Sequence, residues 1–540
     1  MSSVPSVKRS TQFGTMESIP QVQYQHFIPK FVLKNFAHTY KPAGPRPRAR
    51  KKGSENNNHG GGPRRGELVA RNIDLTREDP IICESPISRL LGDINMYDDA
   101  TKPSLAEQRR LEELLGRFEN QAARIFAKIT KAYGEHQERM QREGGQPSLD
   151  ENGSVCLTRS ERDCIRKFLF ILFYRSRQLR CRFDHGTAGD YDGVDKEFVR
   201  EHMQEKGYRR PLNVWFDNLK AIIDIDMDLE GKWNDELPKR MYPDDALWFI
   251  NHTEMYYMSI CTPANPEQEF ILTDNSYGVF EGPINFTRDQ ETGEVEESVH
   301  CPLHLFAPIS PKLMIVLRFF MLPTPLEDDD EEIKKSREEM RRDYLDRFFG
   351  ADLLSRTRLS ELPVAKARNN YSQMVDGRLV PLPGYDGKRK KEHRFDFAFF
   401  PINSWHVNSI NALLLDNLDQ STRVVFDSTA SLAKTLEWYL AAPCHVAGKV
   451  LTGMQDGREE CLRKLEAVSR SLGSTKKTVT GRLKVPLEAQ GDGNLKKNFE
   501  GSRRMWKKLA VDEDKDVRAF VERMEKPEGG SFLSYTALGM

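Results

Sequence analysis

Apolar side chains recur at helical spacing along two long stretches in the first half of the chain. Between residues 105 and 133 they repeat at steps of three and four, which is typical of an amphipathic helix with one buried face. The run CIRKFLFILFYRSRQLR is apolar on nearly every side in its middle, and Thr158 with Glu161 precedes it in the T-x-x-E pattern of a helix start. The pattern therefore predicts two long helices, the second of them central in the core. We expect further helices after Pro29, over residues 195–226 and 244–260, after residue 327, and over residues 403–417 and 431–442.

Short runs of β-type residues appear in the second half of the chain. FILTD at residues 270–274 predicts a buried strand, and residues 303–320 predict two strands on either side of a break at Ser310 and Pro311. The segments RFDFAFFPI and TRVVFDS add two more. The expected fold class is α+β: a predominantly helical body with a small, antiparallel sheet built from segments near residues 270, 303, 313, 395 and 423.

Composition divides the chain into one large domain with polar segments beside and within it. Residues 1–22 lack an apolar pattern and are expected to be a disordered leader. Residues 23–470 form the expected main domain, followed by a basic linker at 471–498 and a C-terminal helical tail at 499–540. Three polar stretches are expected to be insertions into the main domain, near residues 41–66, 283–299 and 378–393.

Charge and cysteine usage narrow the class of protein. The 540 residues include 81 basic and 81 acidic side chains, so the whole molecule has no net field that would attract nucleic acid or acidic lipid. The eight cysteines are scattered without a CxxC pair, which indicates reduced thiols. Neither a signal-peptide core nor an apolar run of roughly 20 residues is present. We therefore expect a soluble intracellular protein, cytoplasmic or nuclear, without a membrane partner.

Four passages in order resemble the fungal form of a family known as domain of unknown function 4238. They are QHFIPKFVLKNF at residues 25–36, FYRSRQLR at 173–180, FILTDN at 270–275 and PLHLFAPISP at 302–311, with a weaker fifth, VNSINALLL, at 407–415. The resemblance covers residues 24 to about 430. The basic segment after Tyr40 and the acidic loop before His300 depart from the compact bacterial form. The resemblance implies a shared fold and a shared site, and it supplies no reaction, cofactor or partner.

Three polar residues are candidates for catalysis. His26 stands between Gln25 and an apolar pair, where an imidazole can act as a base, a phosphate donor or a metal ligand. Asp274 and Asn275 follow a predicted buried strand, so Asp274 is a candidate general base or ligand of a divalent metal. The structural alternative stays open for all three, because His can tether a segment and Asp and Asn favour turns.

Candidate ligand-binding residues lie on two of the predicted helices. Arg175, Arg177 and Arg180 end the central helix, and a buried arginine needs a carboxylate or phosphate partner. Glu119 and Asp274 are the candidate structural partners, and a phosphate-bearing ligand is the functional one. Asn408 and Asn411 share a helix face and can bind a ligand or satisfy backbone groups.

Two basic runs are candidates for contact with nucleic acid. Clustered cations can bind phosphate backbones, although neither run contains the aromatic side chains of a single-strand binder, and a solvated loop is the alternative. The basic residues are Arg46, Arg48, Arg50, Lys51, Lys52, Lys388, Arg389, Lys390 and Lys391.

Two hypotheses of function follow from these motifs. The first is a hydrolase-like enzyme that processes phosphorylated substrates or nucleic acid, with His26 as acid or base, Asp274 as base or metal ligand, and an arginine binding phosphate. The second is a non-catalytic binding or scaffold protein in which the same residues are internal ties. The chain lacks the common P-loop, zincin and serine-hydrolase motifs. Convergence of the polar residues at one site would favour the enzyme.

Overall fold

The computed structural model describes residues 23–42, 63–143, 153–191, 193, 195–288, 295–300, 302–325, 327–349, 357–418, 421–451 and 457–482. The predicted leader at 1–22, the predicted tail at 499–540, the last part of the predicted linker and the basic run from Arg46 to Lys52 lie outside the described residues.

A seven-stranded mixed sheet forms the centre of the molecule. Its order is β14-β17-β7-β13-β12-β9, and β6 pairs with β17. The β17–β7 pair is parallel, whereas the other pairs are antiparallel. The strands are β6 (Ser154–Thr158), β7 (Tyr256–Pro263), β9 (Phe280–Glu281), β12 (His304–Ser310), β13 (Leu313–Phe319), β14 (Arg368–Asn369) and β17 (Arg394–Ile402).

Both faces of this sheet are buried. In β12, Leu305 and Ala307 join one apolar cluster, whereas Phe306 between them joins the other. In β13, Ile315 joins the first cluster and Val316 joins the second. A strand covered on both faces reads as a continuous apolar run instead of an alternating one. The sheet is therefore the middle layer between two apolar cores.

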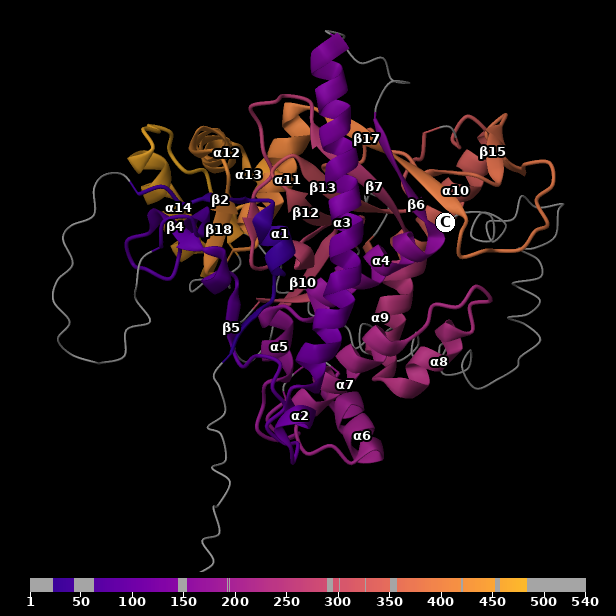
Figure 1. The fold of residues 1–540 in the computed structure, drawn as a ribbon, viewed down its shortest axis with the longest axis horizontal. Coiled ribbons are helices and arrows are strands. Elements are labelled where there is room, and N and C mark those ends of the chain that lie inside the picture. Colours follow the sequence, from indigo (N-terminus) through magenta and orange to yellow (C-terminus); the bar gives the residue numbers. More distant parts are fainter. Residues whose placement is uncertain are drawn as a thin grey trace, which may run out of the picture.

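The first core lies between the sheet and a helical layer. The long helix α3 crosses in front of the sheet, with α4 beside it and the α5–α9 helices below (Figure 1). Phe31 of α1 packs on Phe126 of α3 and Phe168 of α4. The helices are α1 (Lys30–Lys34), α2 (Leu105–Gln108), α3 (Arg110–Glu143), α4 (Arg159–Tyr174), α5 (Arg177–Phe183), α6 (Lys196–Lys206), α7 (Pro211–Asp224), α8 (Trp233–Arg240) and α9 (Pro243–Glu254).

The second core lies under a smaller, five-stranded sheet and the late helices, which gather on one side of Figure 1. Its strands are β2 (Ala37–Thr39), β3 (Leu68–Asp74), β4 (Ile81–Pro86), β8 (Leu272–Thr273) and β18 (Arg423–Phe426). Its helices are α11 (Ser404–Asp416), α12 (Thr429–Ala441), α13 (Cys444–Ala447) and α14 (Gly457–Ser471).

Smaller elements complete the described chain. Helix α10 covers Glu331–Phe349, and short 3-10 turns lie at η1 (Ile87–Arg89) and η3 (Ser276–Gly278). Four two-stranded sheets pair β1 (Tyr24–His26) with β5 (Gly92–Ile94), β10 (Ile284–Arg288) with β11 (Val295–His300), β15 (Ser372–Val375) with β16 (Arg378–Pro381), and β19 (Val450–Leu451) with β20 (Gly481–Arg482).

The structure confirms the α+β class and corrects its proportions. Of the described residues, 44% are helical and 21% are in strands, so the body is not clearly predominantly helical and the sheet is not small. The expected helix over residues 244–260 ends at Glu254, and Tyr256 begins the central strand β7. A fully buried strand has no polar alternation, so its apolar run resembles the continuation of a buried helix. The parallel pairing of β7 with β17 also corrects the expected antiparallel sheet.

Several local predictions are confirmed. Helix α4 begins at the expected capping box, in which Thr158 Oγ1 accepts from Glu161 N at 3.2 Å and Thr158 N donates to Glu161 Oε2 at 2.7 Å. Asn403 caps α11. The seven cysteines in the described part of the chain are free thiols.

Among the described helices, none combines the length and apolar character that a bilayer crossing requires.

Candidate functional site

Arg175 lies directly after α4 and is fully buried. Its Nη1 donates to Glu119 Oε1 of α3 at 2.6 Å, and its Nε donates to the carbonyl oxygen of Phe27 at 3.2 Å. A buried guanidinium needs such acceptors, because its removal from water is costly. The helix-ending arginine therefore connects α3, α4 and the chain between β1 and α1.

Further hydrogen bonds bring the other motif passages to the same region. Asn35 Nδ2 donates to the carbonyl oxygen of Ile309 at 2.6 Å, and Tyr277 Oη donates to that of Pro308 at 2.8 Å. Burial raises the pKa of Tyr277, while the charge of Arg175 opposes that rise, so Arg175 lies within electrostatic range of Tyr277. The passages around residues 25–36, 173–180, 270–278 and 302–311 thus form one connected unit.

His26 lies at the end of β1 with its ring held in one tautomer. Its Nδ1 is 3.0 Å from the carbonyl oxygen of Leu90, which can only accept, so Nδ1 carries the hydrogen and Nε2 keeps its lone pair. Burial lowers the pKa of His26 to about 4, and the positive charges of Lys30 and Arg175 add to this effect. The ring is therefore neutral at pH 7. A neutral imidazole fixed by a backbone carbonyl is the form that acts as a base or metal ligand.

Five buried side-chain polar atoms of this unit have no hydrogen-bond partner among the described residues. They are His26 Nε2, Arg175 Nη2, Arg180 Nε, Asp274 Oδ1 and Asn275 Oδ1. The Asn275 side chain lies over η3, since a Cβ added at Gly278 would be 2.7 Å from Asn275 Oδ1 and 3.1 Å from the Phe173 ring. An acceptor nitrogen, a guanidinium donor and an amide oxygen thus remain unused where the family motifs meet. We call His26, Arg175, Asn275 and Glu119 the His26 cluster.

Carboxylates and cations surround the His26 cluster. Burial, followed by the negative charge of Glu119, raises the pKa of Glu112, while Arg175 and Lys30 oppose the rise. Tyr97 Oη donates to the carbonyl oxygen of His26 at 3.3 Å. The cluster therefore combines a neutral imidazole, a guanidinium and a carboxylate.

Asp274 makes its contacts with Thr422 instead of with His26. Its Oδ2 accepts from Thr422 N at 2.7 Å and from Thr422 Oγ1 at 2.8 Å, while its Oδ1 has no partner. Burial raises the pKa of Asp274. The negative charge of Asp274 also raises the pKa of Tyr24 in β1, so Asp274 lies within electrostatic range of the first motif passage. Asp274 thus borders the His26 cluster and ties it to β18.

The other predicted ligand-binding residues occupy different environments. Arg177 is exposed, and Arg180 forms an ion pair with Asp184 at 3.0 Å. Asn408 Oδ1 accepts a hydrogen bond from Gln268 Nε2 at 3.4 Å. Asn411 is fully buried, with Oδ1 accepting from Ile271 N at 3.2 Å and Nδ2 donating to Glu269 O at 2.8 Å. Of the three arginines, the structure buries Arg175 and leaves Arg177 in solvent.

The basic run near residue 390 is an exposed loop with partial charge neutralisation. Lys390 pairs with Asp386 at 3.1 Å, and Lys391 pairs with Asp226 at 3.4 Å. Lys388 is exposed. Surface pairs of this kind contribute little free energy and leave the side chains available for other contacts.

Some residues of the site were predicted from the sequence and others were not. The sequence predicted that a buried arginine among Arg175, Arg177 and Arg180 would pair with Glu119, with Asp274 or with an anionic ligand, and the structure shows Arg175 paired with Glu119. Gln25 was missed as a functional residue: its Oε1 accepts from Tyr97 N at 2.6 Å, and its Nε2 donates to Asp98 Oδ1 at 3.0 Å. Its position in the QHFIP passage was the available signal. Tyr97 lies 72 positions away in sequence and gave none.

A second buried polar network was also missed. Asp245 Oδ2 accepts from Tyr174 Oη at 2.6 Å and from Asn218 Nδ2 at 2.9 Å. Arg182 Nη2 donates to Asp195 Oδ2 at 2.6 Å. These groups come from five separate segments, so no local spacing in the sequence predicts them. Their hydrogen-bonding groups are largely paired with one another, as in a structural network.

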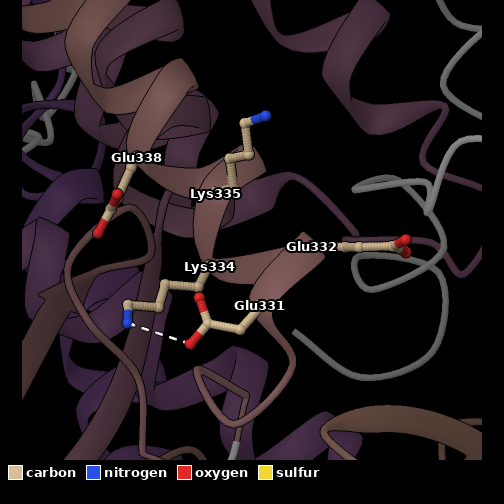
Figure 2. A pocket seen from close by; sticks show the side chains of 5 residues that line it. All are labelled: Glu331, Glu332, Lys334, Lys335 and Glu338. Atoms are coloured by element: carbon tan, nitrogen blue, oxygen red, sulfur yellow. Dashed lines mark hydrogen bonds and ion pairs between the residues drawn. The ribbon is translucent and has the colours of Figure 1, made fainter.

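A hollow elsewhere on the surface does not bring functional groups together. A hollow of about 460 Å³ lies on α10, lined by Glu331, Glu332, Lys334, Lys335 and Glu338. In Figure 2, Lys334 and Glu331 point toward one another and form an ion pair at 3.4 Å, whereas Glu332, Lys335 and Glu338 point in separate directions. The hollow is a row of surface charges on one helix and not a converging site. Among the described residues, no three His, Cys, Asp or Glu side chains gather closely enough to hold a metal ion.

Comparison with known proteins agrees with the geometry of the motif passages. The family model described as "Protein of unknown function (DUF4238)" matches residues 24–430. The chain matches no curated protein and no solved structure. The matched range begins at β1 and includes all four passages that meet around Arg175. With most of the sequence matched, the chain belongs to the DUF4238 family.

Proposed function

We propose that this protein is a hydrolase-like enzyme that acts on a phosphorylated substrate or nucleic acid at the His26 cluster. One observation carries the proposal: the Nε2 lone pair of a neutral imidazole and the Nη2 group of a guanidinium are both buried and unpartnered within one unit. Leaving buried polar atoms unpaired costs free energy, and a ligand that pairs with both removes that cost. The family description itself assigns no activity.

Each residue has a role that follows from its atoms. His26 Nε2 accepts a proton from an attacking water or hydroxyl group, and the Leu90 carbonyl keeps the ring oriented for that transfer. Arg175 Nη2 donates to an oxygen on which negative charge develops, and Glu119 with Phe27 holds the guanidinium in place. Asn275 Oδ1 accepts from a hydroxyl or amide of the ligand. Asp274 Oδ1 is free to act as a second base or to bind a divalent metal.

The remaining candidate residues fit the periphery of such a site. Arg177 and Arg180 follow Arg175 on α5 and would attract the anionic substrate. Asn408 is half-buried on α11 and would contact a distal part of the ligand. The basic residues Lys388, Arg389, Lys390 and Lys391 would contact a nucleic-acid backbone.

A non-catalytic binding or scaffold protein is the second candidate function. The observation that favours it is the saturation of several predicted site residues. Asn411 uses both amide atoms on the backbone, and Asp274 Oδ2 holds Thr422. Arg175 also uses two of its nitrogens on Phe27 and Glu119. Under this alternative, the unpartnered atoms contact buried water and the charged loops bind partners.

The biological setting is part of the same proposal. The polar insertions after Tyr40 and before His300 support the fungal form of the family. The free thiols of the described cysteines support a reducing, intracellular location. The domain division into residues 1–22, 23–470, 471–498 and 499–540 rests on composition alone.

Turnover of model substrates by matched histidine variants tests the proposal. The purified protein is assayed on phosphomonoesters, phosphodiesters and short RNA and DNA, with and without divalent metal, beside His26→Gln and the control His38→Gln. His38 is also half-buried but pairs with Glu84 at 2.8 Å, away from Arg175. Loss of at least about 100-fold in kcat for His26→Gln alone, with an unchanged melting temperature, supports the enzyme. Equal turnover by both variants contradicts it.

A further inference from the structure

Helix α4 buries four cations along its first half. Arg159, Arg162, Arg166 and Lys167 expose 4, 5, 5 and 8% of their surface. Within the described part of the chain, Arg162 alone pairs with a carboxylate, that of Asp163 at 2.9 Å. Buried cations normally require a paired anion, because isolated charge in a low-dielectric interior is costly. The other three form no ion pair with a carboxylate among the described residues, although Asp163, Asp224 and Asp226 act on them at longer range.

Neutral oxygens hold these three cations. Arg159 donates to the carbonyl oxygen of Lys390 at 3.2 Å and to Tyr371 Oη at 3.0 Å. Arg166 donates to the carbonyl oxygens of residues 253 and 256 at 2.7 and 2.8 Å. Lys167 Nζ donates to those of Ile223 and Ile225, at the end of α7, at 2.7 and 2.6 Å. Each of the three cations is thus held by neutral oxygens, while Arg166 Nε has no hydrogen-bond partner among the described residues.

A hollow of about 150 Å³ opens beside these cations. It lies between α3, the start of α4, the segment that follows α7 and the basic loop before β17. Its lining includes Arg159, Ser160, Lys167 and Lys391 together with Phe118 and Asp226. Three cations from two separate parts of the chain thus face one small space. Two carboxylates, Asp163 and Asp226, line the same space, and they already pair with Arg162 and Lys391.

We propose that this hollow binds the phosphate group of a small ligand, with Arg159, Lys167 and Lys391 supplying the positive charge. Charge-assisted hydrogen bonds to phosphate oxygens would compensate the charge that the protein itself leaves unpaired. Ser160 also lines the hollow, and its Oγ donates to the carbonyl oxygen of Lys391 at 3.5 Å. Burial lowers the pKa of Lys167 to about 8, and a bound phosphate would favour its charged form.

This site is separate from the His26 cluster. Lys167 precedes Arg175 by eight residues, which corresponds to about 12 Å along a helix axis. Arg159 lies farther still, at the opposite end of α4. The inference therefore goes beyond the proposed function, and either can fail without the other. The bound phosphate could belong to a small phosphate ester or to a nucleic acid. We assign the site to a small phosphate ester.

Thermal melting in inorganic phosphate tests the proposal. The full chain is melted in rising phosphate against chloride of equal ionic strength, and a saturable rise in Tm is expected for the wild type. Lys391→Met should weaken phosphate binding about tenfold, because one charge-assisted contact is lost. Lys167→Gln keeps a donor for the helix-end carbonyls, removes the charge and should abolish the shift.

Two controls make the result decisive. Lys128→Met removes the same charge from α3, but Lys128 pairs with Glu161 and does not line the hollow, so binding should be unchanged. His26→Gln should also leave the phosphate shift intact, which separates this site from the proposed function. If the Lys167→Gln variant does not fold, the Lys391→Met variant still tests the proposal, because Lys391 is exposed. No saturable shift, equal weakening by Lys128→Met, or a shift with short RNA but none with inorganic phosphate overturns the proposal.

Discussion

Arg175 Nη1 lies 2.6 Å from Glu119 Oε1, and the arginine side chain is fully buried while 27% of the glutamate side chain is exposed. The pair joins α3 to the end of α4. Because Arg175 also binds the Phe27 carbonyl, it fixes the segment that carries His26. Removal of the carboxylate would leave a buried cation with only a neutral acceptor.

Glu119→Ala should therefore lower the free energy of unfolding by about 3 kcal/mol. The measurement is urea denaturation at pH 7. Glu113→Ala is the matched control, since Glu113 lies on the same helix and forms exposed pairs with Arg110 and Arg117. Exposed pairs contribute little free energy because water and salt screen them, so the control should change the stability little. Similar effects of both substitutions would show that the buried pair has no special role.

Stability should fall as the pH decreases, and His252 should contribute to that fall. Burial lowers the pKa of His252 to about 3, and its Nε2 has no partner among the described residues. An unfolded histidine binds a proton below about pH 6.5. The folded protein does not bind that proton until near pH 3. The contribution of His252 to the free energy of unfolding is therefore full above pH 6.5 and is lost as the pH falls towards 3.

Over that range, protonation of His252 in the unfolded chain lowers the free energy of unfolding by at most about 5 kcal/mol. His252→Phe should flatten the dependence of the urea midpoint on pH between 6.5 and 4, because the ring packs 5.3 Å from Phe170 and phenylalanine cannot titrate. A parallel pH profile for the variant and the wild type would contradict this assignment.

The start of α4 should depend on its capping box. Thr158→Ala removes the acceptor of Glu161 N, and a lost N-cap costs about 1 kcal/mol. Thr158→Ser keeps the hydroxyl and should retain most of the stability. Chemical denaturation of the three proteins side by side measures the difference. An alanine variant as stable as the serine variant would show that packing alone defines this helix start.

The extent to which the sequence predicted the fold follows from the range of each interaction. The capping box of α4 and the strands β12 and β13 were predicted because their patterns are local. The size of the sheet was not, since β12 and β13 send alternate apolar residues to two cores and show no polar alternation. Strands β3 and β4 were missed, although they form a local hairpin, and β3 also pairs with the distant β18, as in Val424 against Ile73.

The candidate site shows the same limit. The cost of burying a guanidinium predicted an acidic partner for one of three arginines, with Glu119 and Asp274 as alternatives, and did not identify Arg175 or choose Glu119. The carbonyl of Leu90 that holds His26 lies 64 positions away and has no side-chain identity that a sequence could reveal. Long-range contacts to backbone atoms therefore escape motif reasoning, even where the motif residue itself is recognised.

The state of the His26 ring is the central claim, and ¹⁵N NMR of the histidine-labelled protein measures it directly, with His26→Gln used to assign the signals. A neutral ring at pH 6, protonated on Nδ1 and titrating near pH 4, is the expected result. A ring that is already cationic at pH 6, or one that carries its hydrogen on Nε2, would contradict the role of His26 as a proton acceptor.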